Sequence, residues 1–268
     1  MKKLLLGQHT PVVEIYSPEL LYPIPRSEAR EALGITGELP FFGIDVWYAY
    51  ELSWLDRAGK PVARVARFMI PATTPNLIES KSFKLYLNSL YQMRFDSEQE
   101  AINCISKDVA AIAGQDIGLE LFSPDDDCLA GHKLEGVCLD GGVAAVSQSG
   151  PDKALLKVGA TVTQERLYSH LLRSLCPVTG QPDWATLWIH YRGATIDHNS
   201  LLNYIIAYRQ HQEFHEQCVE RMFQDIKSRC NAEFLHIQAF YTRRGGLDIS
   251  PFRSTQADAK PQPRLNRQ

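Results

Sequence analysis

The sequence lacks the features that mark several large classes of protein. No apolar run approaches the roughly 20 residues that a membrane-spanning helix needs. The net charge of −3 gives no basic excess for general binding to nucleic acid or to a membrane surface. Neither G-x-G-x-x-G nor G-x-x-x-x-G-K-[ST] occurs, so neither a Rossmann dinucleotide site nor a P-loop is indicated.

Cysteine pairs at redox or metal-binding spacing are also missing. The cysteines are scattered, with no C-x-x-C, at positions 104, 128, 138, 176, 218 and 230. Free thiols in a reducing compartment are therefore expected. The start of the chain, MKKLLLGQHT, has an apolar run too short for a signal peptide and no small-residue cleavage site after it. The sequence predicts a cytoplasmic protein.

What is present is ample apolar material for a packed core, because 44% of the 268 residues are hydrophobic. Two segments repeat one order of elements: strand, turn, strand, helix, helix. In the first segment these are predicted over 41–55, 61–70, 77–90 and 96–113. Ser97 and Glu100 stand at capping-box spacing at the start of the last helix. The pattern favours an α+β fold built by internal duplication.

The second segment has predicted strands and helices over 166–176, 183–193, 197–210 and 213–230. Asp197 or Asn199 is the expected N-cap of the first of these helices. One more strand and a glycine-rich turn follow within 233–249. We therefore predict two modules, 1–111 and 159–268, joined by an irregular connection over 112–158. The composition of 254–268 suggests a mobile end.

The stretch SLCPVTGQPDWATLWIHY, residues 174–191, carries the clearest chemical signal. With a turn centred on 179–180, Cys176 and Asp183 would lie directly opposite each other, about 5 Å apart at Cβ. The two prolines beside them would also face each other and leave the ladder open. A thiol is a strong nucleophile and a carboxyl group can supply a proton. The structural alternative is a packed cysteine and a turn-forming aspartate.

Metal ligation is only weakly indicated. His211 and His215 have the i, i+4 spacing of a possible ligand pair, but H-E-x-x-H is absent. A second group, in CLAGHKLEGVC, fits no standard zinc module and consists of Cys128, His132 and Cys138. The sequence predicts no metal site.

Two basic stretches are candidates for binding phosphate. In ESKSFK, Glu79 and Ser80 precede a predicted helix on which Lys81 and Lys84 share one face. The start of a helix with nearby lysines suits an anion, although solvated lysines on an amphipathic helix are the plainer interpretation. TRRGG, residues 242–246, places two arginines before a flexible turn.

Taken together, ESKSFKLYLNS, LCPVTGQPDWATLWIHY, EFHEQCVERMF and TRRGG resemble the long, two-module form of the QueF family, the NADPH-dependent 7-cyano-7-deazaguanine reductases of queuosine biosynthesis. The resemblance covers essentially the whole chain. It implies tandem tunnelling-fold modules, each an antiparallel sheet with two helices. It also implies a homodimer that uses two NADPH per turnover and no metal, and that binds a deazapurine but neither nucleic acid nor a membrane.

The resemblance also implies residue roles. Cys176 would be the nucleophile that forms a thioimidate with the nitrile, and Asp183 the proton donor. The substrate-binding residues would be Ile78, Glu79, Ser80, His215 and Glu216. Those that contact NADPH would be Ser80, Lys81, Arg244 and Gly245. The first module keeps ESKS and lacks the cysteine, whereas the second has the cysteine and DHNS in place of ESKS.

Two other functions stay open at this point. A hydrolase similar to GTP cyclohydrolases would need a Cys/His metal-ligand set, which is poor here. A non-catalytic purine- or pterin-binding module would account for Glu79 and Glu216 but not for a cysteine and an aspartate at a hairpin.

Overall fold

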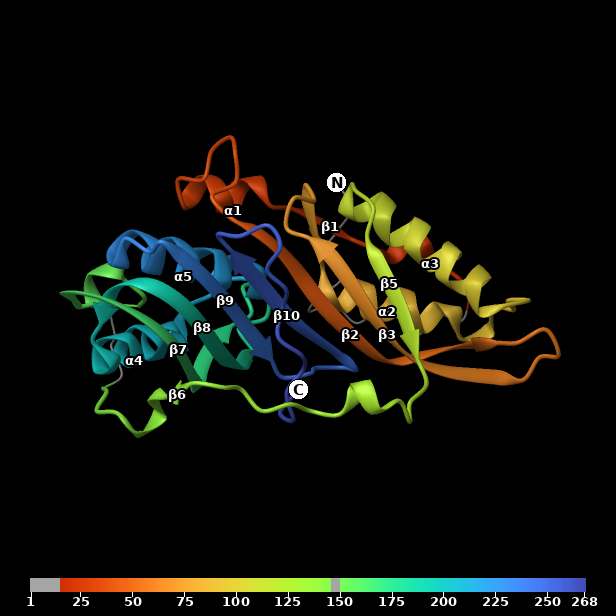
Figure 1. Cartoon of the computed structure of the whole chain (residues 1–268). Coiled ribbons are helices and arrows are strands. Elements are labelled where there is room, and N and C mark those ends of the chain that lie inside the picture. Colours follow the sequence, from red (N-terminus) through yellow and green to blue (C-terminus); the bar gives the residue numbers. More distant parts are fainter. Residues whose placement is uncertain (1–14, 146–149) are drawn as a thin grey trace. The chain divides into compact units, whose positions relative to one another are not determined.

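The computed structural model describes residues 15–145 and 150–268 as a mixed α+β fold (Figure 1). The start of the chain, on which the signal-peptide argument rests, and part of the loop expected around 147–152 lie outside these ranges. The chain divides into two compact units. The first consists of the described residues up to Gly34 together with Asp45–Ala130 and Arg243–Ile249; the second consists of Ile35–Ile44, Gly131–Thr242 and Ser250–Gln268. None of the described helices is long and apolar enough to span a membrane.

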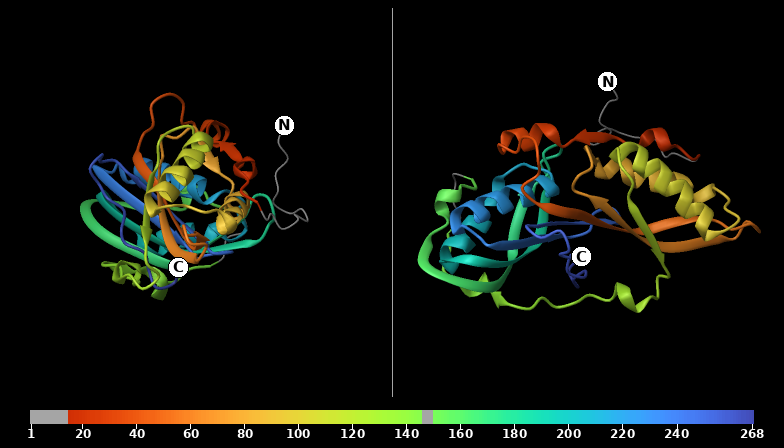
Figure 2. Two further views of the ribbon diagram at one scale, coloured as in Figure 1. Left: turned by 90° about the vertical axis from the view of Figure 1, so that its right-hand side faces the viewer. Right: turned by 45° about the horizontal axis from the view of Figure 1, so that its top comes forward.

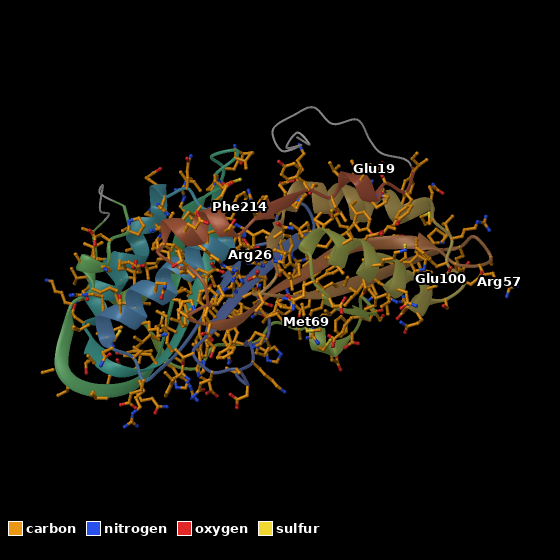
Figure 3. All side chains as sticks on the ribbon, turned by 90° about the horizontal axis from the view of Figure 1, so that it is seen from above. Glu19, Arg26, Arg57, Met69, Glu100 and Phe214 are labelled. Carbon is orange, nitrogen blue, oxygen red and sulfur yellow. The ribbon has the colours of Figure 1, made fainter. Side chains whose placement is uncertain are left out.

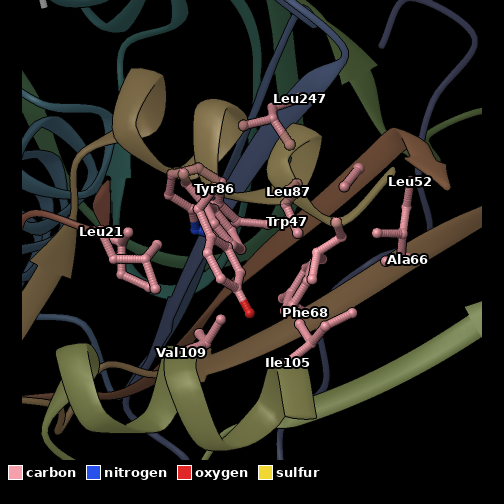
Figure 4. Packing of buried hydrophobic residues seen from close by; sticks show 14 of the residues in the cluster. Leu21, Trp47, Leu52, Ala66, Phe68, Tyr86, Leu87, Ile105, Val109 and Leu247 are labelled. Carbon is pink, nitrogen blue, oxygen red and sulfur yellow. The ribbon is translucent and has the colours of Figure 1, made fainter. Parts of the chain in front are cut away.

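The first unit packs helices on one face of antiparallel strands. Its elements are β1 (Pro23–Pro25), α1 (Ser27–Ala32), β2 (Phe42–Leu55), β3 (Pro61–Pro71), β4 (Asn76–Ile78), α2 (Ser80–Ser89), α3 (Glu98–Ala113) and β5 (Gly118–Phe122). Strand order is β5-β3-β2, and the first residues of β2 belong to the second unit. Figure 4 shows Trp47 and Phe68 of the sheet meeting Tyr86, Ile105 and Val109 of the two helices.

The starts of two helices in this unit, α2 and α3, differ in detail from the prediction. The segment 77–90 opens with the end of β4, and α2 begins only at Ser80 because Glu79 is extended and caps the helix. Ser97 caps α3 as expected and accepts a hydrogen bond from Glu100 N at 3.2 Å. The Glu100 carboxylate, however, accepts from Asp96 N at 2.8 Å, one residue earlier than a capping box requires.

A buried ion pair also belongs to the first unit. The Arg26 guanidinium, labelled in Figure 3, lies 2.6 Å from a carboxylate oxygen of Asp45, and both residues are almost completely buried. Arg26 Nε also donates to Thr74 Oγ1 at 3.2 Å. Removing either partner would leave a buried charge without its counter-ion, which is far more costly than the pair itself is stabilising.

The second unit has strand order β10-β9-β8-β7-β6. Its elements are β6 (Val137–Cys138), β7 (Val158–Leu175), β8 (Pro182–Ile196), α4 (His198–Ile206), α5 (His215–Cys230), β9 (Phe234–Tyr241) and β10 (Leu247–Ser254), whose first residues belong to the first unit. Both helices cover one face of these strands (Figure 2). Asp197 caps α4 through a 2.8 Å hydrogen bond from Ser200 N. The single strand expected within 233–249 is in fact the pair β9 and β10.

A β-bulge interrupts the pairing of β7 with β8. Ser169 is opposite Leu187 and Leu172 is opposite Ala185, so His170 and Leu171 together face the single residue Thr186. A bulge inserts one extra residue into a strand and increases its bend. The strong curvature of β7 is visible in both views of Figure 2.

The expectation of a mobile C-terminal end is wrong. Leu265 packs in one apolar cluster with Trp188, Phe240 and Phe252 on the face of the sheet away from the helices. Gln268 Nε2 donates to Ser250 Oγ at 2.6 Å. The composition of the tail is that of a loop, but the apolar patch on the sheet needs a cover, and the few apolar side chains of the tail provide it.

The same face holds a cavity of about 280 Å³, lined by Glu135, Arg166, Trp188, His190, His236, Gln256, Asp258, Ala259, Lys260 and Gln262. None of the predicted site residues lines it. Burial lowers the pKa of His190 to about 4, and the positive charges of Arg166 and His236 act in the same direction. His190 is therefore held neutral in the folded protein at neutral pH.

This shift predicts a loss of stability in mild acid. Between pH 6.5 and about 4 the unfolded chain protonates His190 while the folded chain does not, so the free energy of unfolding should fall as pH falls through this window. Urea unfolding at pH 7.5 and 5.0 measures the loss. The variant His190→Gln should lose less stability over this interval than the parent. An equal loss in both proteins would show that His190 does not titrate as stated.

Candidate active site

The hairpin of β7 and β8 has a different register from the one expected. Ser174, not Cys176, is directly opposite Asp183. Cys176 N donates to Gln181 O, and Gly180 N donates to Cys176 O, both at 2.9 Å. The loop therefore has four residues, 177–180, and closes at Gly180 with a φ of +67°. The predictions that Cys176 and Asp183 are directly opposed, and that the two prolines face each other, are wrong.

Cys176 and Asp183 nevertheless share one face of the hairpin. Residues two apart on a strand point to the same side, so Cys176 lies on the side of Ser174 and hence of Asp183. The two are diagonal neighbours, which is within reach of longer side chains or of a small molecule placed between them. Both are buried, with 5% and 4% of their surface exposed.

The start of α5 is held against this hairpin. Leu175 N donates to His211 O at 2.8 Å, and Leu175 also forms a parallel bridge with Gln212. The chain then turns at Phe214, labelled in Figure 3, which precedes the first helical residue, His215. His215 and Glu216 are thereby brought to the end of the hairpin.

His215 is fixed by two neighbours. Its Nε2 lies 3.1 Å from Asp183 Oδ2, and its ring stacks on Tyr241 of β9 with centroids 3.7 Å apart and planes 10° apart. His215 Nδ1 is buried and has no hydrogen-bond partner among residues 15–145 and 150–268. Because buried polar atoms are nearly always paired, this nitrogen is suited to a bound molecule.

Tyr241 and Ser174 belong to this site and were missed by the sequence analysis. Tyr241 is opposite Ala185, on the face of the sheet that carries Asp183. Burial raises its pKa well above the ordinary value. The alternation of apolar residues along 234–241 could have placed Tyr241 on the helix side, but not against His215.

Glu216 is the second residue of α5, and 4% of its surface is exposed. The positive end of the helix dipole stabilises a carboxylate there. His211 and His215 do not form a common site, because His211 Nε2 pairs with Glu213 Oε2 at 2.9 Å whereas His215 pairs with Asp183.

The remaining predicted residues belong to the first unit. Ile78, Glu79, Ser80 and Lys81 are consecutive at the junction of β4 and α2. The Glu79 carboxylate accepts hydrogen bonds from Lys81 N at 2.9 Å and Ser82 N at 2.7 Å, and only 1% of its surface is exposed. Glu79 is thus a helix cap as well as a candidate ligand-binding residue.

Arg244 and Gly245 lie in a tight turn of the first unit. Arg244 N donates to Leu247 O at 2.9 Å, and Gly245 has a φ of +58°. A Cβ atom at Gly245 would lie 3.0 Å from Lys84 Nζ and would have to displace this flexible side chain, and the positive φ itself favours glycine. Lys84 Nζ also lies 3.5 Å from Glu51 Oε2, and the Arg243 guanidinium lies 3.8 Å from the centre of the Tyr50 ring. Cations therefore gather around this turn, which suits an anionic ligand.

Both segments of the sequence match families of known proteins. Residues 12–121 match the family model of the N-terminal part of the nitrile reductase 7-cyano-7-deazaguanine reductase, and residues 182–260 match the model of QueF-like proteins. The NADPH-dependent 7-cyano-7-deazaguanine reductase of Chromohalobacter salexigens is 49% identical over 265 residues, which are 98% of this chain and 96% of the relative. The Burkholderia vietnamiensis reductase is 50% identical over 96% of this chain and 94% of its own.

A crystal structure of the apo form of an archaeosine synthase, QueF-Like, aligns with 38% of this chain and 99% of its own at 14% identity, with a TM-score of 0.31.

The buried thiols of the second unit should differ in reactivity. Burial raises the pKa of Cys218 well above its ordinary value and that of Cys230 to about 12. At pH 8 iodoacetamide should therefore leave both unmodified in the native protein while it alkylates Cys176 at the hairpin. Peptide mass spectrometry after timed reactions gives each rate, and the urea-unfolded protein serves as the control in which all thiols react. Native labelling of Cys218 as fast as that of Cys176 would contradict this.

Proposed function

The chain belongs to the family of NADPH-dependent 7-cyano-7-deazaguanine reductases, and from that premise we propose that Cys176 and Asp183 carry out the chemistry at its active site. The protein is an oxidoreductase that reduces a nitrile with NADPH in queuosine biosynthesis. The assignment is supported by the grouping of Cys176, Asp183 and His215 where the start of α5 meets the end of the β7–β8 hairpin.

The first step is addition of the Cys176 thiol to the nitrile carbon. A carbon–sulfur bond forms, the S–H bond breaks and one C≡N π pair moves to nitrogen. Asp183 gives that nitrogen a proton and takes up the proton of the thiol in its place. The product is a covalent thioimidate, and no group leaves. Asp183 is suited to this role because it is buried, lies on the same side of the hairpin as Cys176, and is oriented by His215.

NADPH supplies two hydrides, the first to the thioimidate carbon and the second to the imine that follows. Between the two, the carbon–sulfur bond breaks and its electron pair returns to Cys176 as thiolate. Two further protons balance the conversion of nitrile to primary amine, giving 7-aminomethyl-7-deazaguanine. The Cys176 side chain is regenerated at the end of each turnover, and no step requires a metal.

Binding of the substrate ring is assigned to carboxylates and His215. A guanine-like ring presents N–H donors along one edge, and carboxylate oxygens accept them in pairs. Glu216 offers such an acceptor in the second unit, and Glu79 retains lone pairs beyond those used for capping. His215 Nδ1 supplies a further polar atom that is otherwise unpaired. Ile78 and Ser80 lie on either side of Glu79 in the sequence and are assigned to the same contact with the substrate ring.

NADPH contacts are assigned to the first unit, at Ser80, Lys81, Arg244 and Gly245. The cations around the Arg244–Gly245 turn suit phosphate groups. The proposal includes tandem tunnelling-fold modules, a homodimer and a cytoplasmic location, the last supported by six free cysteines.

The nucleophile is tested by mixing the protein with 7-cyano-7-deazaguanine in the absence of NADPH. The reaction should stop at the adduct, and the intact mass should rise by the full mass of the substrate because addition to a nitrile expels nothing. Cys176→Ala should give no adduct, whereas the matched variant Cys218→Ala should give the parent mass shift. Adduct formation by Cys176→Ala would refute the assignment.

The variant Asp183→Asn tests the role of Asp183 as proton donor separately from its role in the structure. The amide keeps the size of the side chain and one acceptor for His215 but cannot supply a proton at nitrogen. Substrate binding should persist, while adduct formation and turnover fall by roughly 10²- to 10⁴-fold, as expected for a lost general acid. Stopped-flow measurement of adduct formation and calorimetric measurement of binding distinguish the two effects. Parent turnover in Asp183→Asn would make the carboxylate structural only.

The preference for NADPH is tested by a substitution in the Arg244–Gly245 turn. Arg244→Gln removes a charge-assisted contact to phosphate, worth about 1.5–3 kcal/mol, so KM for NADPH should rise by roughly tenfold or more. Arg57→Gln, an exposed arginine in the β2–β3 turn of the same unit, is the control and should change nothing. The parent should prefer NADPH over NADH in kcat/KM. Equal values for both cofactors would overturn the assignment of these cations to the extra phosphate.

A further inference from the structure

Three metal-ligating side chains meet in the second unit and take no part in the proposed reaction. The Cys138 Sγ, one carboxylate oxygen of Asp140 and one ring nitrogen of His170 all lie within 4.8 Å of one another. The sequence does not suggest this group, because His170 follows the other two by 30 residues and more. In the sequence, Cys138 is grouped instead with Cys128 and His132.

Asp140 is held in place by hydrogen bonds that leave it able to bind a cation. Its Oδ1 accepts from Ser169 Oγ at 2.7 Å, and both of its oxygens lie 3.1 Å from His170 N. Each carboxylate oxygen has more than one acceptor position, so lone pairs remain on this side chain. Its orientation is therefore set before any ligand arrives.

His170 is oriented by a different element. Its Nδ1 lies 2.9 Å from Thr186 Oγ1 of β8, which leaves Nε2 as the nitrogen available for a metal. His170 also occupies the bulge of β7, where an extra residue changes the direction of a side chain. A hydrogen bond at one ring nitrogen is the usual means by which proteins orient a histidine that binds metal through the other.

Cys138 completes the group from the solvent side. It ends the two-residue strand β6, where it pairs with Tyr168 of β7, and its side chain is exposed. Thr186 alternates with Asp183 and Ala185 along β8, so the cluster lies on the side of the sheet opposite to Asp183. It is therefore separate from the candidate active site.

We propose that Cys138, Asp140 and His170 bind one zinc ion, with water as the fourth ligand. A thiolate, an imidazole and a single carboxylate are the ligand types that Zn²⁺ prefers, whereas Mg²⁺ and Ca²⁺ need more oxygen ligands. Bond lengths of about 2.0–2.3 Å in a tetrahedron place ligand atoms roughly 3.5 Å apart. Closing the cluster from its present spread requires only small side-chain rotations, and exposed Cys138 is free to make them.

The bound ion would fasten the segment around β6 to the middle of β7. That segment is already attached there by a two-residue ladder, by Asp140 and by an ion pair of Glu135 with Arg166. Zinc binding therefore stabilises the second unit and leaves the reductase reaction unchanged, because the ion is on the other side of the sheet. This inference does not depend on the roles assigned to Cys176 and Asp183.

The test measures binding of Zn²⁺ and Co²⁺ to the full-length protein after chelation. The parent should bind one equivalent, with a thiolate-to-cobalt charge-transfer band in the Co²⁺ form and a higher melting temperature with Zn²⁺. Cys138→Ser should lose the band, and Asp140→Asn, which still accepts from Ser169 and His170, should bind Zn²⁺ at least 10- to 100-fold more weakly. The controls Cys128→Ser and His132→Gln should bind as the parent does.

Three results would overturn the proposal. One is the absence of stoichiometric binding by the parent. Another is a charge-transfer band that persists in Cys138→Ser or disappears in Cys128→Ser. The third is loss of NADPH oxidation when zinc is removed, which would move the metal from this surface into the catalytic reaction. Circular dichroism of each metal-free variant shows whether it is folded, so that weaker binding can be assigned to the missing ligand.

Discussion

A backbone hydrogen bond from Leu175 to His211 holds the start of α5 against the end of β7, and the candidate active site depends on it. The bond fixes where the helix begins relative to the hairpin. From there, His215 reaches Asp183 and lies flat on Tyr241, and Glu216 receives the positive end of the helix dipole. Side chains from β7, β8, β9 and α5 thus share one buried location, although only β7 and β8 are joined by a local turn.

Much of the secondary structure could be predicted because it is encoded locally. The strands β2 and β3 have the expected aromatic and β-branched residues, and α3 and α5 have apolar residues at helical spacing. Ser97 and Asp197 cap the helices as expected, since the capping signal lies within four residues. The sequence predicts a start of α2 that is too early. Glu79 has good helix propensity, but in the structure its side chain caps the helix and the residue itself is not helical.

The parts that could not be predicted depend on contacts distant in sequence. Alternation of residues gives the face of a strand but not its partner, so Cys176 and Asp183 were correctly placed on one side and wrongly paired. The tail looked unstructured because the patch it covers, around Trp188 and Phe240, is formed by other strands. Tyr241 and the cluster of Cys138, Asp140 and His170 are likewise invisible until the strands are aligned.

The bulge in β7 changes the phase of the strand. Before it, odd-numbered residues such as Leu167 and Ser169 are buried; after it, even-numbered Leu172, Ser174 and Cys176 are buried. If the strand kept all of its residues and continued without the bulge, its alternation would carry the thiol to the opposite surface from Asp183. The bulge absorbs the extra residue and so keeps the thiol on the buried side. The side of the sheet that carries the thiol therefore depends on whether this upstream stretch of β7 is bulged. A single-codon deletion there would straighten the strand and leave Leu172, Ser174 and Cys176 on the side of the sheet that they already occupy.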